Sequence, residues 1–167
     1  METHDLILKK ARFSDWEALY RNVWRHEETA RYMLWTVTPS EEEAQDRMRR
    51  TIAFQKDHDA FTVYEKSSGE AIGWAGFACV EPGVYEETSI ALGPAFTGKG
   101  YGRQILDLLT EHCKSLGGHT FHYSTRSTNH ASRALAAACG FLLCAEESRT
   151  DPRTGEPYTL LLYKKEL

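Results

Sequence analysis

Apolar positions recur along the chain with two periods, and each period predicts one kind of element. Short apolar runs bounded by turn residues predict strands, whereas apolar positions three and four residues apart predict helices. The predicted strands are residues 6–8, 61–65, 71–80, 87–92, 119–125, 141–145 and 158–164. The predicted helices are residues 14–22, 38–55, 103–116 and 129–139. Because helices and strands are interspersed, this order predicts one mixed α/β domain over residues 1–167.

Two of the helices begin at capping signals. Ser14 and Glu17 fit a capping box, in which each side chain bonds the backbone amide of the other residue. The Thr-Pro-Ser sequence at residues 38–40 precedes three glutamates, and acidic residues favour the positively charged start of a helix. The face of this second helix that we expect to be buried contains Ala44, Met48, Thr51, Ile52 and Gln55.

The composition is that of a folded chain without a membrane span. Hydrophobic residues make up 41% and charged residues 26%, which argues against a disordered chain. No apolar run approaches the ~20 residues that a membrane-spanning helix needs, and the start of the sequence has no secretory pattern. The formal net charge of −4 argues against general nucleic-acid binding. We therefore expect a cytoplasmic protein, monomeric or homodimeric, with no nucleic-acid or membrane partner.

The cysteines carry no sign of a disulfide framework or a metal site. Cys79, Cys113, Cys139 and Cys144 form neither a CxxC nor a CxxH pair. We expect reduced, buried thiols and no bound metal.

A glycine-rich segment carries the clearest chemical signal. It lies between the predicted strand 87–92 and the predicted helix 103–116, with glycines at positions 93, 98, 100 and 102 and a lysine at position 99. Glycines allow backbone amides to approach an anion, and a helix start adds partial positive charge. The segment therefore predicts a phosphate-binding loop, and a tight turn with nothing bound is the alternative.

Two common phosphate-binding patterns do not fit this loop. The P-loop pattern fails at Gly100, where a hydroxyl side chain should hold a magnesium ion. The dinucleotide pattern GxGxxG, started at Gly98, finds Arg103 in place of its third glycine. A phosphate-binding nucleotidase is therefore the weaker interpretation.

Two motifs resemble the GNAT superfamily of acyl-CoA-dependent N-acyltransferases. Residues 97–102, TGKGYG, resemble its pyrophosphate-binding loop [QR]xxGx[GA], with Thr97 in place of Gln or Arg. Residues 129–141 resemble its NxxAxxLYxxxGF helix. In this second motif Ser132 stands where Ala is common, and Ala136 stands where Tyr is common.

The departures in the second motif resemble one branch of the superfamily. The NxxS version without Tyr is similar to the branch that contains ribosomal-protein N-terminal alanine/serine acetyltransferases. Residues 30–33, followed by residues 40–44, also resemble that branch. The likeness extends over nearly the whole chain.

The resemblance implies a fold and an activity. The implied fold is a central, mostly antiparallel twisted sheet of six to seven strands with about four flanking helices. In it, strands 87–92 and 119–125 form a splayed parallel pair. The implied activity is transfer of an acetyl group from acetyl-CoA to a primary amine by direct attack in a ternary complex. The acceptor would be a peptide or protein N-terminus or a small amine. A non-catalytic acyl-CoA-binding or regulatory module on the same fold is the alternative.

The resemblance also implies site residues. Glu87 is the expected general base, with Glu86 as its replacement if the register slips, and we expect Glu87 to share a strand face with Ser89 and Ala91. Ser132 is the expected hydrogen-bond donor to the CoA thiolate, with Tyr123 as a competing candidate. The expected CoA-binding residues are Ile90, Ala91, Leu92, Thr97, Gly98, Lys99, Gly100, Tyr101, Gly102, Arg103, Asn129 and Ser132. Aromatic candidates for the acceptor pocket are Trp24, Tyr32, Trp35, Trp74 and Tyr85, together with His26.

Overall fold

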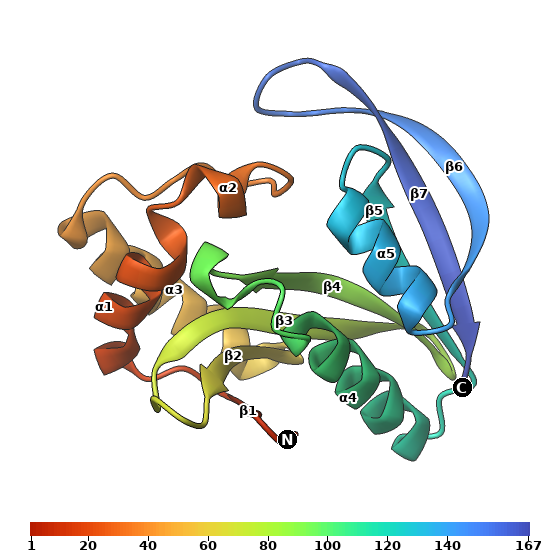
Figure 1. The fold of residues 1–167 in the computed structure, drawn as a ribbon, viewed down its shortest axis with the longest axis horizontal. Coiled ribbons are helices and arrows are strands. Elements are labelled where there is room, and N and C mark those ends of the chain that lie inside the picture. Colours follow the sequence, from red (N-terminus) through yellow and green to blue (C-terminus); the bar gives the residue numbers. More distant parts are fainter.

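A single seven-stranded sheet forms the centre of the computed structural model, which describes residues 1–167 (Figure 1). The strands lie in the order β1-β2-β3-β4-β5-β7-β6. Their bounds are Leu6–Lys9 (β1), Ala60–Glu65 (β2), Ala71–Glu81 (β3), Val84–Leu92 (β4), Thr120–Arg126 (β5), Leu142–Thr150 (β6) and Pro157–Glu166 (β7). The fold is that expected from the sequence, a mixed α/β sheet that is mostly antiparallel.

The one parallel pair, β4 with β5, is short. Its strands pair only at Val84 with Thr120, Tyr85 with Phe121 and Glu86 with His122. Beyond these pairs β4 continues to Leu92 and β5 to Arg126 without pairing to each other. The predicted splayed parallel pair is confirmed, and it leaves a V-shaped gap in the middle of the sheet.

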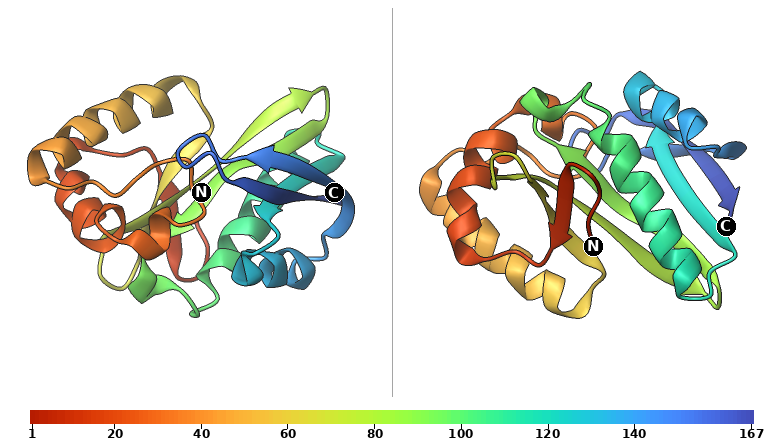
Figure 2. Two further views of the ribbon diagram at one scale, coloured as in Figure 1. Left: turned by 90° about the horizontal axis from the view of Figure 1, so that it is seen from above. Right: turned by 60° about the horizontal axis from the view of Figure 1, so that its bottom comes forward.

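Five α-helices flank the sheet, and they divide between its two faces (Figure 2). Helices α1 and α3 pack on the face of β1–β3 that carries Tyr64, Ala71 and Trp74. Helix α4 packs on the opposite face, and α5 packs beside α4 and against β5. The bounds are Trp16–Leu19 (α1), Glu27–Ala30 (α2), Glu41–Asp57 (α3), Tyr101–Ser115 (α4) and His130–Ala138 (α5). None of them combines the length and apolar character needed to cross a membrane.

Of the two helix starts predicted from capping signals, one is correct and one is wrong. Ser40 caps α3, because its Oγ accepts a hydrogen bond from the Glu43 amide at 3.2 Å. The proposed box of Ser14 and Glu17 is wrong: the Arg12 amide donates to Asp15 Oδ2 at 2.6 Å instead. Tyr64 also donates to Asp15 Oδ2, at 2.5 Å. This contact from the sheet holds Asp15 in position, so the helical segment starts earlier, with a 3₁₀ turn at Phe13–Asp15.

The expectation of buried thiols is correct for two cysteines and wrong for two. All four are free; Cys113 and Cys139 are buried, whereas Cys79 and Cys144 are exposed. Cys144 lies on the edge strand β6, which is exposed along nearly its whole length, and Cys79 lies near the exposed end of β3. Apolar sequence surroundings do not reveal which strand will form the edge of a sheet.

Candidate active site

The glycine-rich loop presents a row of free backbone donors at the start of α4. The amides of residues 98–103 donate to no group within the protein, and the first amide bonded in this helix is that of Gln104, to the Gly100 carbonyl. Gly98 and Gly100 have positive φ angles of 74° and 80°, and nothing lies within 4 Å of a Cβ built on either. Open space above a run of free amides at a helix N-terminus suits an anion.

The side chains of the loop are largely engaged elsewhere. Lys99 Nζ lies 3.6 Å from Glu65 Oε1, and the Tyr101 hydroxyl donates to the same oxygen at 2.7 Å. These contacts, with the Tyr101 bond first, lower the pKa of Glu65. Thr97 Oγ1 donates to the Pro94 carbonyl at 2.9 Å, and Arg103 lies 3.5 Å from Asp107. The anion-binding capacity of the loop therefore resides in its backbone.

A β-bulge in β4 changes the direction of the predicted catalytic side chains. Phe77 pairs with Glu87 and Gly76 pairs with Ser89, so Thr88 is an extra residue in the strand. Consecutive positions of a strand face opposite sides of the sheet, as Gly76 and Phe77 do, so their partners Ser89 and Glu87 also lie on opposite faces. The expectation that Glu87 shares a face with Ser89 and Ala91 is wrong, because strict alternation breaks at the bulge.

Glu87 directly follows the last β4–β5 pair, at the closed end of the V-shaped gap, on the same side of the sheet as Tyr123. Its side chain is partly exposed, yet its surroundings, chiefly burial and then the charge of Glu86, raise its pKa to about 8. A backbone hydrogen bond from Ile90 opposes this increase. Glu86 itself is exposed, on the face opposite to Glu87. The carboxyl of Glu87 is thus poised to gain or lose a proton near neutral pH.

Ser132 and Tyr123, the two candidate donors, contact each other. Their hydroxyl oxygens lie 2.5 Å apart. Burial, followed by the charge of Glu87, raises the pKa of Tyr123, so its phenol keeps its proton. The side chain of Asn129 accepts a hydrogen bond from the Ser132 amide at 3.1 Å and so caps α5. Ala136, where the superfamily commonly has Tyr, is fully buried.

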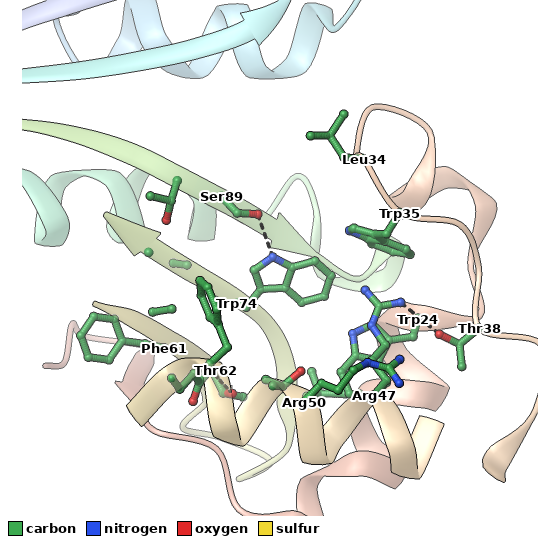
Figure 3. Close-up of a pocket in the computed structure, with 18 of the residues that line it drawn as sticks. Trp24, Leu34, Trp35, Thr38, Arg47, Arg50, Phe61, Thr62, Trp74 and Ser89 are labelled. Atoms are coloured by element: carbon green, nitrogen blue, oxygen red, sulfur yellow. Dashed lines mark hydrogen bonds between the residues drawn. The ribbon is translucent and has the colours of Figure 1, made fainter. Parts of the chain in front are cut away.

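A cavity of about 650 Å³ opens on the other side of the bulge (Figure 3). Thr88 and Ser89 line it from β4, and Trp74 Nε1 donates to Ser89 Oγ at 2.8 Å. Helix α3 and residues 34–38 supply the opposite wall, which includes Trp35 and Arg47. The cavity therefore reaches the bulge of β4, where the alternation of side chains changes, next to the V-shaped gap.

The aromatic candidates separate into three groups. Trp24, Trp35 and Trp74 line the cavity. Tyr85 belongs to the core and packs edge-on against Phe77. His26 lines a separate surface hollow, and the Tyr32 hydroxyl donates to the Thr128 carbonyl at 3.1 Å.

A comparison with protein families identifies the family of the chain. The model of the acetyltransferase (GNAT) domain matches residues 5–142. The chain belongs to this family. The prediction of an acyl-CoA-dependent N-acyltransferase is confirmed at the level of the family.

Three relatives show how far the similarity to other GNAT proteins extends. N-alpha-acetyltransferase RimI of Mycobacterium tuberculosis is 32% identical over 82 residues, which span 47% of this chain and half (50%) of RimI. A Salmonella typhimurium acetyltransferase that modifies the N-terminal serine of ribosomal protein L7/L12 is 22% identical. Its TM-score is 0.80, over 99% of this chain and 96% of that one. A putative acetyltransferase of Salmonella typhimurium, yncA, solved with its cofactor acetyl-CoA, is 21% identical. Its TM-score is 0.71, over 98% and 94% of the two chains.

Sequence reasoning missed several residues that line the cavity. Arg47, Arg50, Arg153, Thr88 and Ser89 all line the cavity. The arginines of α3 lie on a stripe beside its buried face and follow no recognisable motif. Among the expected CoA-binding residues, Ile90 and Leu92 pack against the core cluster, and Ala91 is buried opposite Trp74.

Proposed function

We propose that this GNAT protein is an N-acetyltransferase that moves the acetyl group of acetyl-CoA to a primary amine within a ternary complex. The observation that carries the proposal is the run of free amides from Gly98 to Arg103, beside the gap between β4 and β5. The free amides suit the CoA pyrophosphate, and the edge of β4 at Ile90–Leu92, which pairs with β3 but not with β5, suits the pantetheine arm. The relative solved with acetyl-CoA supports this choice of donor.

The residues at the end of the gap support direct transfer. Acetyl-CoA supplies an activated acyl group, and the amine nitrogen forms a bond to the thioester carbon as the carbon–sulfur bond breaks. The amine must lose a proton, and the ionised carboxylate of Glu87 is the proposed acceptor. The departing thiolate gains a hydrogen bond, and then a proton, from the Ser132–Tyr123 pair. A backbone amide of β4 polarises the thioester carbonyl.

The acceptor enters, in this proposal, through the cavity bordered by Ser89 and Trp74, and its amine passes the β4 bulge into the gap, which Glu87 borders from the opposite strand face. Relatives that act on protein N-termini support a peptide acceptor, and the size of the cavity, about 650 Å³, also suits a small amine. The absence of Tyr at position 136 and of Gln or Arg at position 97 favours the alternative, a module that binds acyl-CoA without turnover.

Two measurements test the proposal in sequence. Thermal unfolding with acetyl-CoA, CoA, ATP or NAD should show stabilisation by the two CoA compounds only. Mass spectrometry should then detect acetylated products from a panel of small amines and peptides. Binding of acetyl-CoA without acetylation of any amine would favour the non-catalytic module, and stabilisation by ATP alone would contradict the proposal.

A further inference from the structure

Arg47 of α3 lines the cavity, and aromatic rings surround its guanidinium. The Arg47 Cζ atom lies 4.1 Å from the ring centroid of Trp35 and 4.8 Å from that of Trp24. The ring centroid of Trp74 is 5.7 Å away, and the rings of Trp35 and Trp74 are themselves 5.5 Å apart. These contacts fix the position of the guanidinium within the cavity wall (Figure 3).

The charge of Arg47 has no acidic partner in the protein. Its one hydrogen bond runs from Nη1 to Thr38 Oγ1 at 3.0 Å, and no carboxylate lies within 4.0 Å. Burial, followed by the nearby charge of Arg50, lowers the pKa of Arg47 to about 10. Arg126 and Arg153, by contrast, share the carboxylate of Asp151 at 2.8 Å each. A half-buried guanidinium with free donors is incompletely compensated.

The other ionisable side chains that line the cavity leave an excess of positive charge, although Arg153 is paired with Asp151. They are Glu43, Arg50 and Arg153, so three arginines and one glutamate line the cavity in a chain whose net charge is −4. An arginine with free donors recognises carboxylate and phosphate oxygens geometrically as well as by charge.

Arg47 and Ser89, which borders the proposed transfer point, lie at different ends of the cavity. Figure 3 shows Trp74 reaching from its hydrogen bond with Ser89 toward Trp35, beneath which the Arg47 guanidinium lies. The walls between the two ends are mainly aromatic. A ligand that spans the cavity would place one polar end at the bulge of β4 and the other at Arg47, with an apolar body between them.

We propose that the acceptor amine carries an anionic group, a carboxylate or a phosphate, which Arg47 binds inside the ring of Trp24, Trp35 and Trp74. This inference rests on the proposed function and specifies its substrate class. Arg47 is a specificity-determining residue in it, and the amine of the same molecule lies at the β4 bulge, where the cavity meets the V-shaped gap.

The test compares amines that differ only in charge. With saturating acetyl-CoA, kcat/KM is measured for para-(aminomethyl)benzoate, its carboxamide and its phosphonate counterpart. Short peptides with Glu or Gln at the second position form a parallel arm, which distinguishes small acceptors from peptide N-termini. The anionic member of at least one arm should be preferred by about tenfold to a hundredfold. An equal or reversed preference in both arms would overturn the inference.

Variants assign that preference to Arg47. R47Q should abolish it, R47K should retain part of it, and R49Q should leave it unchanged. Arg49 is the matched control because it lies on the same helix but pairs with Asp46 outside the cavity. A preference that survives in R47Q would overturn the inference, and R47K covers the case in which R47Q does not fold.

A binding measurement separates this inference from the proposed function. Three of the four tryptophans of the chain line the cavity, so titration of the benzoate and its carboxamide should be visible in intrinsic fluorescence. If no amine is acetylated, the proposed function fails. Tighter binding of the benzoate, lost in R47Q, would still support the anion site, and equal binding of both compounds would contradict it.

Discussion

Tyr123 Oη and Ser132 Oγ lie 2.5 Å apart, so the two hydroxyls that the sequence offers as alternative thiolate donors form one pair. Tyr123 is 5% exposed on β5, whereas Ser132, at the start of α5, is less buried. In the proposed mechanism Ser132 donates a proton to the CoA thiolate and receives one from the phenol of Tyr123. The two residues then act together as one donor.

The hydroxyl pair predicts non-additive losses. Ser132→Ala and Tyr123→Phe should each lower kcat about tenfold with little change in the Kd of acetyl-CoA, because charge on sulfur develops mainly in the transition state. The double variant should be little worse than either single variant. Tyr163→Phe is the control, since that ring packs 6.5 Å from Tyr123. Fully additive losses would show that the hydroxyls act independently.

Glu87→Gln should remove activity in a pH-dependent way. With a pKa of about 8, the wild-type carboxyl is mostly protonated at pH 6 and ionised at pH 9. The loss in kcat should therefore be greatest above pH 8, about a hundredfold or more, and small near pH 6. Glu86→Gln should retain the activity, but its pH profile should move to lower pH, because the charge of Glu86 helps to raise the pKa of Glu87. A uniform loss across the pH range would move the base to another group.

The same substitution has a consequence for stability. The pKa of Glu87 is raised from 4.5 in the unfolded chain to about 8, so its favourable contribution is complete below pH 4.5 and is lost as pH rises through 8. Glu87→Gln should therefore melt close to wild type at pH 4.5 and about 5 °C higher at pH 9. Thermal unfolding by circular dichroism at both pH values measures this difference, and a constant offset would contradict it.

Substituting a glycine of the loop should weaken CoA binding, and a glycine outside the loop provides a matched control. Gly100→Val should weaken CoA binding at least about a hundredfold, because a side chain there fills the space above the free amides. Gly117, at the other end of α4, also has a positive φ of 87° and open surroundings, so Gly117→Val introduces comparable strain away from the loop. Calorimetric titration should show normal CoA binding for Gly117→Val. Lys99→Ala should cost only about threefold, since its charge is shared with Glu65.

Replacing Arg153 should affect binding of the acceptor and stability, but not binding of CoA. It pairs with the buried Asp151 and donates to the carbonyls of Ala30 and Trp35, which joins the β6–β7 turn to the wall of the cavity. Arg153→Ala should raise the KM of the acceptor about tenfold and lower the melting temperature, with an unchanged Kd for CoA. Arg149→Ala, which removes an exposed pair with Glu147, is the control. A parallel change in CoA affinity would show that the turn supports both sites.

The proposed CoA-binding side was predictable from the sequence because its geometry depends on backbone conformation. Gly98 and Gly100 adopt left-handed conformations that favour glycine, and Asn129 caps α5 in the expected way. These features are local, so short motifs encode them.

The cavity proposed for the acceptor could not be predicted because tertiary contacts create it. The extra residue Thr88 reverses the direction of the strand's side chains, and no sequence signal marks that bulge. Arg47 meets Trp24, Trp35 and Trp74 from three separate segments. Only the folded chain brings those segments together, so aromatic content alone could not separate pocket residues from core residues such as Tyr85.

Because β4 and β5 pair over a short stretch, few backbone hydrogen bonds join the two halves of the sheet at its centre. Three residue pairs join the β1–β4 half to the β5–β7–β6 half, where neighbouring strands elsewhere share longer ladders. A pantetheine arm lying in that gap would act as a surrogate strand that completes the ladder. The donor would then be a temporary piece of the architecture as well as a reactant, and each turnover would begin by completing the sheet and end by reopening it.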